Sequence, residues 1–304
     1  VRSSAASDVY KRQFLICKER VMQSVETPSV KASIKSIINN KPILLMTLSQ
    51  ILGSFAVGGS KQDYYIDVLN FASLGLITGI PGSIINPFSY MAVPWFRRHF
   101  SSRFLYIIGN KIDGILLVPV FLVGCIGGKK HGLYKNIWVM GIAMMLWETI
   151  FMIFYGVRRI IPTEMYNEAM DYCEWKNGYR TEGMTSVAQG LASKLASIFS
   201  RYISNYIKQL IGYDLTRYVR GTAQTDETKF GLFAMFTIVP FLTGMISIIP
   251  MLFYDLSGKK KEKMYEELLE RRAAMSKEAT SGDLEALERL AKAQMEIGNM
   301  KQEL

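Results

Sequence analysis

Acidic and basic side chains alternate over a short polar stretch in the second half of this 304-residue chain. Glu164, Glu168, Asp171 and Glu174 are followed by Arg180. Pairs of carboxylates perform acid and base chemistry in glycosidases, but these four lie on one local segment among basic residues. The chain also lacks a Gly-x-Ser-x-Gly sequence, a Walker sequence and a His/Cys cluster. We therefore predict that the protein is not an enzyme and holds neither a cofactor nor a metal ion.

Three cationic residues, Lys194, Arg201 and Lys208, recur at seven-residue intervals in the next apolar run. On an α-helix this spacing drifts by only ~20° per step, so the three share nearly one face. A charge at mid-bilayer costs at least ~2.5–3.5 kcal/mol, so such side chains normally face a cavity or a partner. We assign Lys194 to a cavity, expect Lys208 to reach the outer membrane interface, and treat Arg201 as intermediate. If two of them face the cavity, an anionic ligand would fit there.

Three aromatic residues within apolar runs could also contact a substrate. Tyr64 and Tyr65 could offer a ligand a hydroxyl group and an apolar ring face, although aromatic residues are also common at membrane interfaces. Trp147 lies in the middle of a later apolar run. The predicted substrate-binding residues are these three together with Lys194 and Arg201.

Two carboxylates within apolar runs, Asp113 and Glu148, are candidate countercharges for the cationic residues. Lys111 is a local alternative partner for Asp113. A lone intramembrane glutamate such as Glu148 can carry a proton or form half of a structural ion pair, and the pair is the commoner case. We predict that Lys194, Asp113 and Glu148 take part in charge pairing or cation coupling.

The composition is typical of a polytopic membrane protein. The mean hydropathy is +0.14, 49% of the residues are hydrophobic and the charges are bunched. A net charge of +10 could indicate nucleic-acid binding. However, the basic residues fall mostly between apolar runs, without a zinc spacing or an RNA-binding signature. The cysteines, Cys17, Cys125 and Cys173, are too far apart to suggest a disulfide framework or a metal site.

The apolar runs predict an all-α membrane protein with six transmembrane helices and a charged cytoplasmic helical tail, residues 257–304. Residues 1–13 resemble translated adapter sequence and are interpreted as non-native, and residues 14–41 form a cytoplasmic approach segment. A bilayer helix needs ~20 residues, and the predicted spans, within a bundle of residues 42–256, are about 42–69, 74–96, 104–126, 137–161, 182–212 and 230–256. The first is expected as one long helix weakened at Gly58-Gly59, and a short helix followed by an exterior loop is the alternative.

The distribution of basic residues predicts the orientation. The segments expected on the side of the N-terminus contain 25 Lys and Arg residues, against 6 in the opposite loops. Because cytoplasmic loops carry the excess of basic residues, both ends of the chain are expected in the cytoplasm, with the protein in the plasma (inner) membrane.

Residues 171–180, DYCEWKNGYR, resemble the Asp-Tyr-x-Glu-x-Lys-x-Gly-x-Arg motif of the glycoside-pentoside-hexuronide:cation symporters. These form the melibiose-permease-like branch of the major facilitator superfamily. Further similarities are Asn40-Lys41-Pro42 at a helix start, Tyr64-Tyr65, Lys194 in the helix after the motif and Gly212-Tyr213 at the end of that helix. The resemblance covers about residues 18–256 and implies that the chain is the C-terminal half of a twelve-helix transporter.

The resemblance also implies a function. Members of the family carry a sugar with a sodium ion or a proton by alternating access of two helical bundles. Lys194 would lie near the sugar and cation sites, and the cation-binding carboxylates would lie mainly in the N-terminal half. The implied partners are a sugar or glycoside, the lipid bilayer and that other half, and the alternative is a non-transporting sensor or an inert fragment. The predicted cytoplasmic gate consists of Arg159, Glu168, Asp171, Tyr172, Glu174, Lys176, Gly178 and Arg180.

Overall fold

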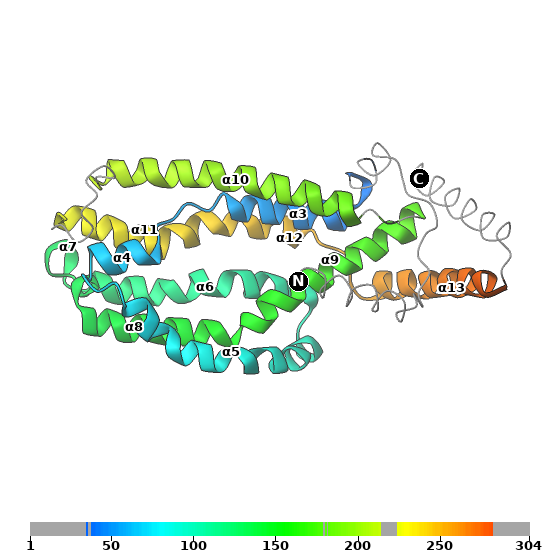
Figure 1. Cartoon of the computed structure of the whole chain (residues 1–304), viewed down its shortest axis with the longest axis horizontal. Helices are drawn as coiled ribbons and strands as arrows, with labels where there is room; N and C mark the ends of the chain where they lie inside the picture. The colour runs from blue at the N-terminus through cyan, green and yellow to red at the C-terminus, as the bar shows by residue number, and fades with distance from the viewer. Residues whose placement is uncertain (1–34, 36–37, 179, 181, 214–223, 282–304) are drawn as a thin grey trace, which may run out of the picture. The chain divides into compact units, whose positions relative to one another are not determined.

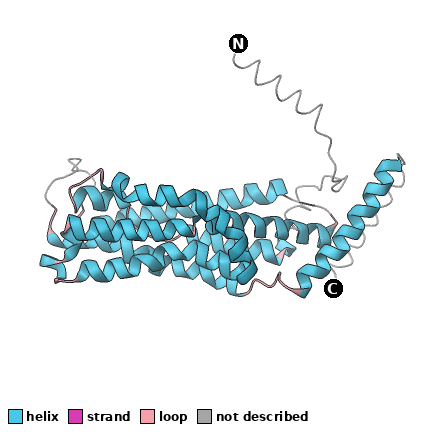
Figure 2. Ribbon diagram, turned by 90° about the horizontal axis from the view of Figure 1, so that it is seen from below, coloured by secondary structure: helices cyan, strands magenta, loops and turns pink. Residues whose placement is uncertain are grey.

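The computed structural model describes residues 35, 38–178, 180, 182–213 and 224–281. Every regular element in these residues is helical (Figure 2), as the sequence predicts. In chain order (Figure 1) the elements are α3 (Lys41–Ser54), α4 (Lys61–Asp67), α5 (Leu74–His99), α6 (Ser102–Cys125), α7 (Gly128–His131), η1 (Leu133–Lys135), α8 (Ile137–Ile153), α9 (Tyr155–Asn177), α10 (Glu182–Leu210), α11 (Asp226–Gly244), η2 (Met245–Ile248), α12 (Ile249–Leu252) and α13 (Lys259–Ser281).

The packing divides the chain into two units. The larger unit comprises residues 41–168 and 185–255, and the smaller unit comprises residues 1–40, 169–184 and 256–304. Within the larger unit, α5 packs along α8, and α6 packs along both α8 and α11. The described part of the smaller unit contains the end of α9, the beginning of α10 and α13.

Short polar side chains set the beginnings of several helices. The hydroxyl of Ser60 accepts a hydrogen bond from the backbone N–H of Gln62 at the start of α4, 3.1 Å away. The Asn136 side chain accepts from two N–H groups at the start of α8, and Thr225 caps α11 in the same way. Such caps satisfy backbone donors that have no partner within the helix, so the elements begin where the sequence changes from loop to apolar run.

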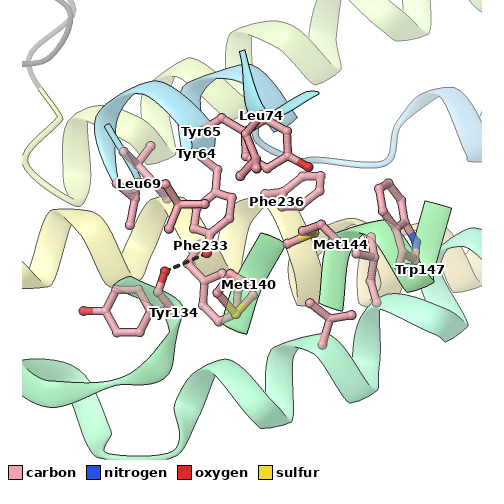
Figure 3. Packing of buried hydrophobic residues seen from close by; sticks show 14 residues of the cluster. Tyr64, Tyr65, Leu69, Leu74, Tyr134, Met140, Met144, Trp147, Phe233 and Phe236 are labelled. Carbon is pink, nitrogen blue, oxygen red and sulfur yellow. Dashed lines mark hydrogen bonds between the residues drawn. The ribbon is translucent and has the colours of Figure 1, made fainter. Parts of the chain in front are cut away.

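An aromatic cluster forms the core of the larger unit (Figure 3). The rings of Tyr64 and Tyr134 lie 5.3 and 5.4 Å from the ring of Phe233, centroid to centroid. The Tyr64 hydroxyl donates to the Tyr134 carbonyl oxygen across 2.7 Å, so this polar group is satisfied inside the core. This cluster joins α4, η1 and α11.

Three helical segments are long and apolar enough to cross a membrane, judged by length and composition: Ser102–Cys125, Ile137–Asn177 and Asp226–Leu252. They contain the predicted span 137–161 and most of the spans 104–126 and 230–256. Within the described residues, the segments predicted as 42–69, 74–96 and 182–212 are helical but do not meet that criterion. The first is divided into two short helices, and α10 carries three cations among its polar residues.

Two boundaries differ from the sequence prediction. The predicted single helix over 42–69 is interrupted at residues 55–60, between α3 and α4. The predicted fourth span, which was expected to end at Ile161, continues as α9 to Asn177, so most of the motif is helical and not a loop. Gly178 then adopts a φ of +80° and ends the helix, because a left-handed conformation suits glycine.

Candidate functional site

The motif residues Asp171 and Glu174 are held by two arginines in the smaller unit. Three residues apart on α9, the carboxylates share one helix face. The guanidinium of Arg272, on α13, lies 2.8 Å from Asp171 and 2.5 Å from Glu174. Arg180 lies 2.8 Å from Asp171 and 3.4 Å from Glu174, and it also donates to Glu182 across 2.8 Å. We call these four side chains, Asp171, Glu174, Arg180 and Arg272, the motif cluster.

The pKa of both arginines is raised. For Arg272 the hydrogen bond to Glu174 is the main cause, opposed by burial and helped by Asp171. For Arg180 burial acts in the opposite direction, and the contacts with Glu182, Asp171 and Glu174 outweigh it. Both guanidinium groups therefore stay charged at every physiological pH.

Helix α13 makes further contacts with the end of α9. The indole N–H of Trp175 donates to Glu267 across 2.7 Å, and Arg271 donates to the Trp175 carbonyl oxygen across 3.1 Å. The Tyr265 hydroxyl donates to Asp171 across 3.3 Å. The sequence predicts an amphipathic helical tail but not its contact with the motif. The signal that could have suggested one is the Arg271-Arg272 pair, whose charges need acidic partners.

The other predicted gate residues lie outside the motif cluster and have different partners. Lys176 donates to the carbonyl oxygen of Asn39 across 3.2 Å, and Tyr172 is buried. Glu168 and Arg159 belong to the larger unit. Arg159 donates to the Tyr155 hydroxyl across 3.1 Å, on its own helix.

A cationic stripe on α10 consists of Lys194, Arg201 and Lys208. Of these three, only Lys208 is paired in the described structure. The Lys208 amine lies 2.6 Å from the Asp63 carboxylate, and its position at the outer membrane interface stays a prediction. The Lys194 and Arg201 side chains are exposed. The spacing therefore identifies residues on one helix whose environments differ.

Two serines of α10 form hydrogen bonds with backbone groups of the interrupted segment between α3 and α4. The Ser200 hydroxyl donates to the Ala56 carbonyl oxygen across 2.7 Å, and the Ser204 hydroxyl accepts from the Gly58 N–H across 3.2 Å. The Gly59 N–H donates to the Met235 carbonyl oxygen of α11 across 2.7 Å. Irregular backbone at membrane depth needs protein partners of this kind, and discontinuous helices commonly border the binding sites of transporters.

The two carboxylates within apolar runs, Glu148 and Asp113, lie in different environments. Glu148 pairs with Lys61 across 2.9 Å and accepts from Thr78 across 3.2 Å, which is a structural ion pair. Lys111 does not pair with Asp113, because its amine donates to the Gly244 carbonyl oxygen across 2.6 Å. In the described part of the chain, neither carboxylate pairs with Lys194.

The three aromatic residues predicted to bind substrate lie in the core. Tyr64 and Tyr65 are fully buried. The Trp147 indole N–H donates to the carbonyl oxygen of Asp113 across 3.2 Å. In this structure all three pack inside the larger unit, and their contact with a substrate stays a prediction.

Two polar cavities in the larger unit were missed by the sequence prediction. Their volumes are about 240 and 490 Å³, and both are lined by Gln50, Tyr106, Asn110 and Arg158. Asn110 and Arg158 are polar residues within or next to apolar runs. That pattern was the available signal, but sequence alone does not show that the two residues meet.

Comparison with known proteins is consistent with this arrangement. Residues 10–258 match the family described as MFS/sugar transport protein. The glucuronide carrier protein homolog of Escherichia coli (strain K12) is 23% identical over 266 residues, which cover 84% of this chain and 54% of that protein. The putative sulfoquinovose importer of the same strain is 25% identical over 260 residues, covering 80% and 49% respectively. The isoprimeverose transporter of Lactiplantibacillus pentosus is 24% identical over 264 residues, covering 86% and 51%.

The chain thus spans about half the length of the curated relatives it matches, and these relatives are named as a carrier, an importer and a transporter. The match extends over most of the chain and includes Asp171, Glu174 and Arg180 of the motif cluster. The resemblance inferred from the DYCEWKNGYR sequence is confirmed: the chain is an integral membrane protein of the MFS/sugar transport family, of the glycoside and hexuronide symporter type.

Proposed function

We propose that this chain forms the C-terminal six-helix half of a symporter that moves a sugar or glycoside together with Na⁺ or H⁺ by alternating access. The observation that carries the proposal is the motif cluster, because the family's charged motif is present and its carboxylates are paired with arginines. The names of the relatives concern glucuronide, sulfoquinovose and isoprimeverose. They support a sugar-like substrate, with a hexuronide among the candidates.

The motif cluster would act as a cytoplasmic gate. Arg180 and Arg272 each contact both carboxylates, so the cluster has a closed arrangement with all four charges compensated. Separating them costs the charge-assisted hydrogen bonds. Substrate binding in the cavity between the two halves would supply the differential free energy that shifts the population from closed to open.

The α10 helix would form one wall of that cavity. Lys194 and Arg201 are exposed on it, and both would face the other half of the transporter. By the family resemblance, the cation-binding carboxylates would lie mainly in that other half, and the coupling ion would be selected there.

Uptake measurements test the proposal. Vesicles containing the intact protein should accumulate a labelled glycoside when an inward Na⁺ or H⁺ gradient is imposed, and accumulation should collapse when an ionophore dissipates it. This chain alone should give no counterflow, because alternating access requires one bundle to move against another. Binding of glycosides without uptake by the intact protein would instead indicate a sensor, and counterflow by this chain alone would contradict its role as one half.

A further inference from the structure

The two adjoining cavities of the larger unit have a cationic lining. Arg158 lines both, Lys111 lines the smaller and Arg159 lines the larger. Among the described residues, neither lining includes Asp or Glu. Asp113, two residues after Lys111 on α6, lines neither cavity and forms no ion pair with Arg158 in the described structure.

Arg158 has unused hydrogen-bonding capacity. Its guanidinium lies 5.3 Å from the centroid of the Phe151 ring, which fixes its position from one side. Within the part of the chain that the structure describes, its N–H groups have no acceptor. A guanidinium presents five donors in a planar fork that matches a carboxylate or another oxyanion. The donors of this half-buried arginine are therefore available to an oxyanion in the cavity.

Neutral polar groups surround the two cations. Gln50 and Asn110 line both cavities, and Ser49 lines the smaller one. The Asn110 amide donates to the Tyr106 carbonyl oxygen across 2.9 Å, which fixes its orientation. The Lys111 amine uses one of its donors on Gly244 and keeps others. Hydroxyl and amide groups beside cations suit a ligand that combines an anion with several hydroxyls.

The size of the cavities fits such a ligand. Ligand pockets are typically about 300–1,000 Å³, and the larger cavity has about 490 Å³. The smaller, at about 240 Å³, has room for one charged end of a molecule whose remainder occupies the larger. We propose that Arg158 and Lys111 bind the anionic substituent, a carboxylate or sulfonate, of the glycoside. This inference rests on the proposed function and moves anion recognition from the α10 stripe to the interface of α3, α6 and α9.

Uptake by the intact transporter that contains this chain tests the proposal, with a glucuronide and the neutral glucoside of the same aglycone as paired substrates. Arg158→Gln should raise the KM for the glucuronide by about 10- to 100-fold, because hydrogen bonds to charged groups are lost. The KM for the glucoside should change by less than about threefold. Arg158→Lys should lie between wild type and Arg158→Gln, since it retains the charge and loses the fork.

Two further variants make the comparison specific. Arg98→Gln removes a positive charge from the last turn of α5, outside both cavities, and should leave both KM values unchanged. Arg201→Gln tests the competing site on α10. The proposal is overturned if Arg158→Gln changes both substrates equally or neither, or if Arg201→Gln alone removes the preference for the glucuronide.

A binding measurement separates this proposal from the proposed function and from a lipid site. Free glucuronide should raise the thermal unfolding midpoint of the protein in neutral detergent, and Arg158→Gln should abolish that rise. A rise that depends on Arg158 without any uptake would contradict transport and support the anion site. If phosphatidylglycerol gives the rise that depends on Arg158 and glucuronide gives none, the site holds a lipid phosphate and the proposal is overturned.

Discussion

Helices α5 and α10 are both long and largely apolar, but they are attached to the larger unit in different ways. Along α5, small residues bring backbones together: a Cβ on Gly82 would lie 2.9 Å from Met152. A Cβ on Gly156 of α9 would lie 2.6 Å from the Ser89 carbonyl oxygen of α5. A Cβ on Gly190 of α10 would have no atom of another described element within 4 Å. Close helix contact therefore holds α5, as is common in membrane bundles.

Helix α10 is held mainly by separate polar contacts. Gln189 donates to Thr47 across 2.6 Å, and the contacts of Ser200, Ser204 and Lys208 continue along the same helix. Its large apolar side chains are exposed, with Tyr202 at 74%. A closely packed interface resists small displacements, whereas single hydrogen bonds can be exchanged one at a time. The comparison indicates that α5, α8 and residues 155–168 of α9 form a closely packed, rigid part, and that α10 is attached by polar contacts that can be exchanged.

The largest expected effect comes from filling the contact between α9 and α5. Gly156→Ala places a methyl group against the Ser89 backbone, which cannot move away as a flexible side chain could. Overpacking of this kind typically costs about 1–3 kcal/mol. The free energy of unfolding, measured by denaturant titration in detergent, should fall by that amount.

Gly190→Ala is the matched control on α10. Open space surrounds the position, and alanine favours a helix over glycine by up to about 1 kcal/mol. Stability should therefore stay the same or rise slightly. If both substitutions destabilise the protein equally, the distinction between a closely packed α5 and a loosely attached α10 is lost.

A double-mutant cycle on Lys208 and Asp63 should give the next largest effect. The two groups are 2.6 Å apart and nearly buried, so each charge relies on the other. Polar pairs in membrane proteins contribute about 1–2 kcal/mol in favourable cases. Lys208→Gln and Asp63→Asn should each destabilise the protein, and the double variant should cost less than the sum.

The same cycle indicates whether α10 is anchored at this end. A coupling free energy near zero would show that the pair contributes nothing to attaching α10. A cycle on Lys61 and Glu148, which join α4 to the rigid part, provides the reference value.

The sequence alone predicts the helical segments and the family of this protein. Apolar runs identify the helical segments, and the DYCEWKNGYR motif identifies the family. The motif's carboxylates do pair, but their partner Arg272 lies almost a hundred residues away on α13. Helical periodicity states which residues share a face and does not state what that face meets, so this contact could not be predicted.

The aromatic residues also show that a residue's type does not determine what it contacts. Tyr64 and Tyr65 are amphipathic, and their types fit a sugar site and a core equally well. The residue types do not reveal that Phe233 and Tyr134 pack against Tyr64 in the folded chain. Likewise, Gly58-Gly59 marks a weak point in a predicted helix, but a full interruption requires the hydroxyls of Ser200 and Ser204 on another helix.

The smallest expected effect is that of Ser204→Ala, which bears most directly on how α10 moves. The substitution removes the acceptor for the Gly58 N–H, at a cost of about 0.6 kcal/mol by the average for membrane hydrogen bonds. The fold should persist, because Ser200 still donates to Ala56. If α10 shifts during transport by exchanging such contacts, Ser204→Ala in the intact protein should change the rate of uptake more than this small loss of stability implies.

Thr243→Ala, which removes a contact with Val57 from α11, serves as the comparison because it loosens the same segment from another helix. Equal changes in uptake rate for the two variants would show that the segment between α3 and α4 matters and that its attachment to α10 has no separate role.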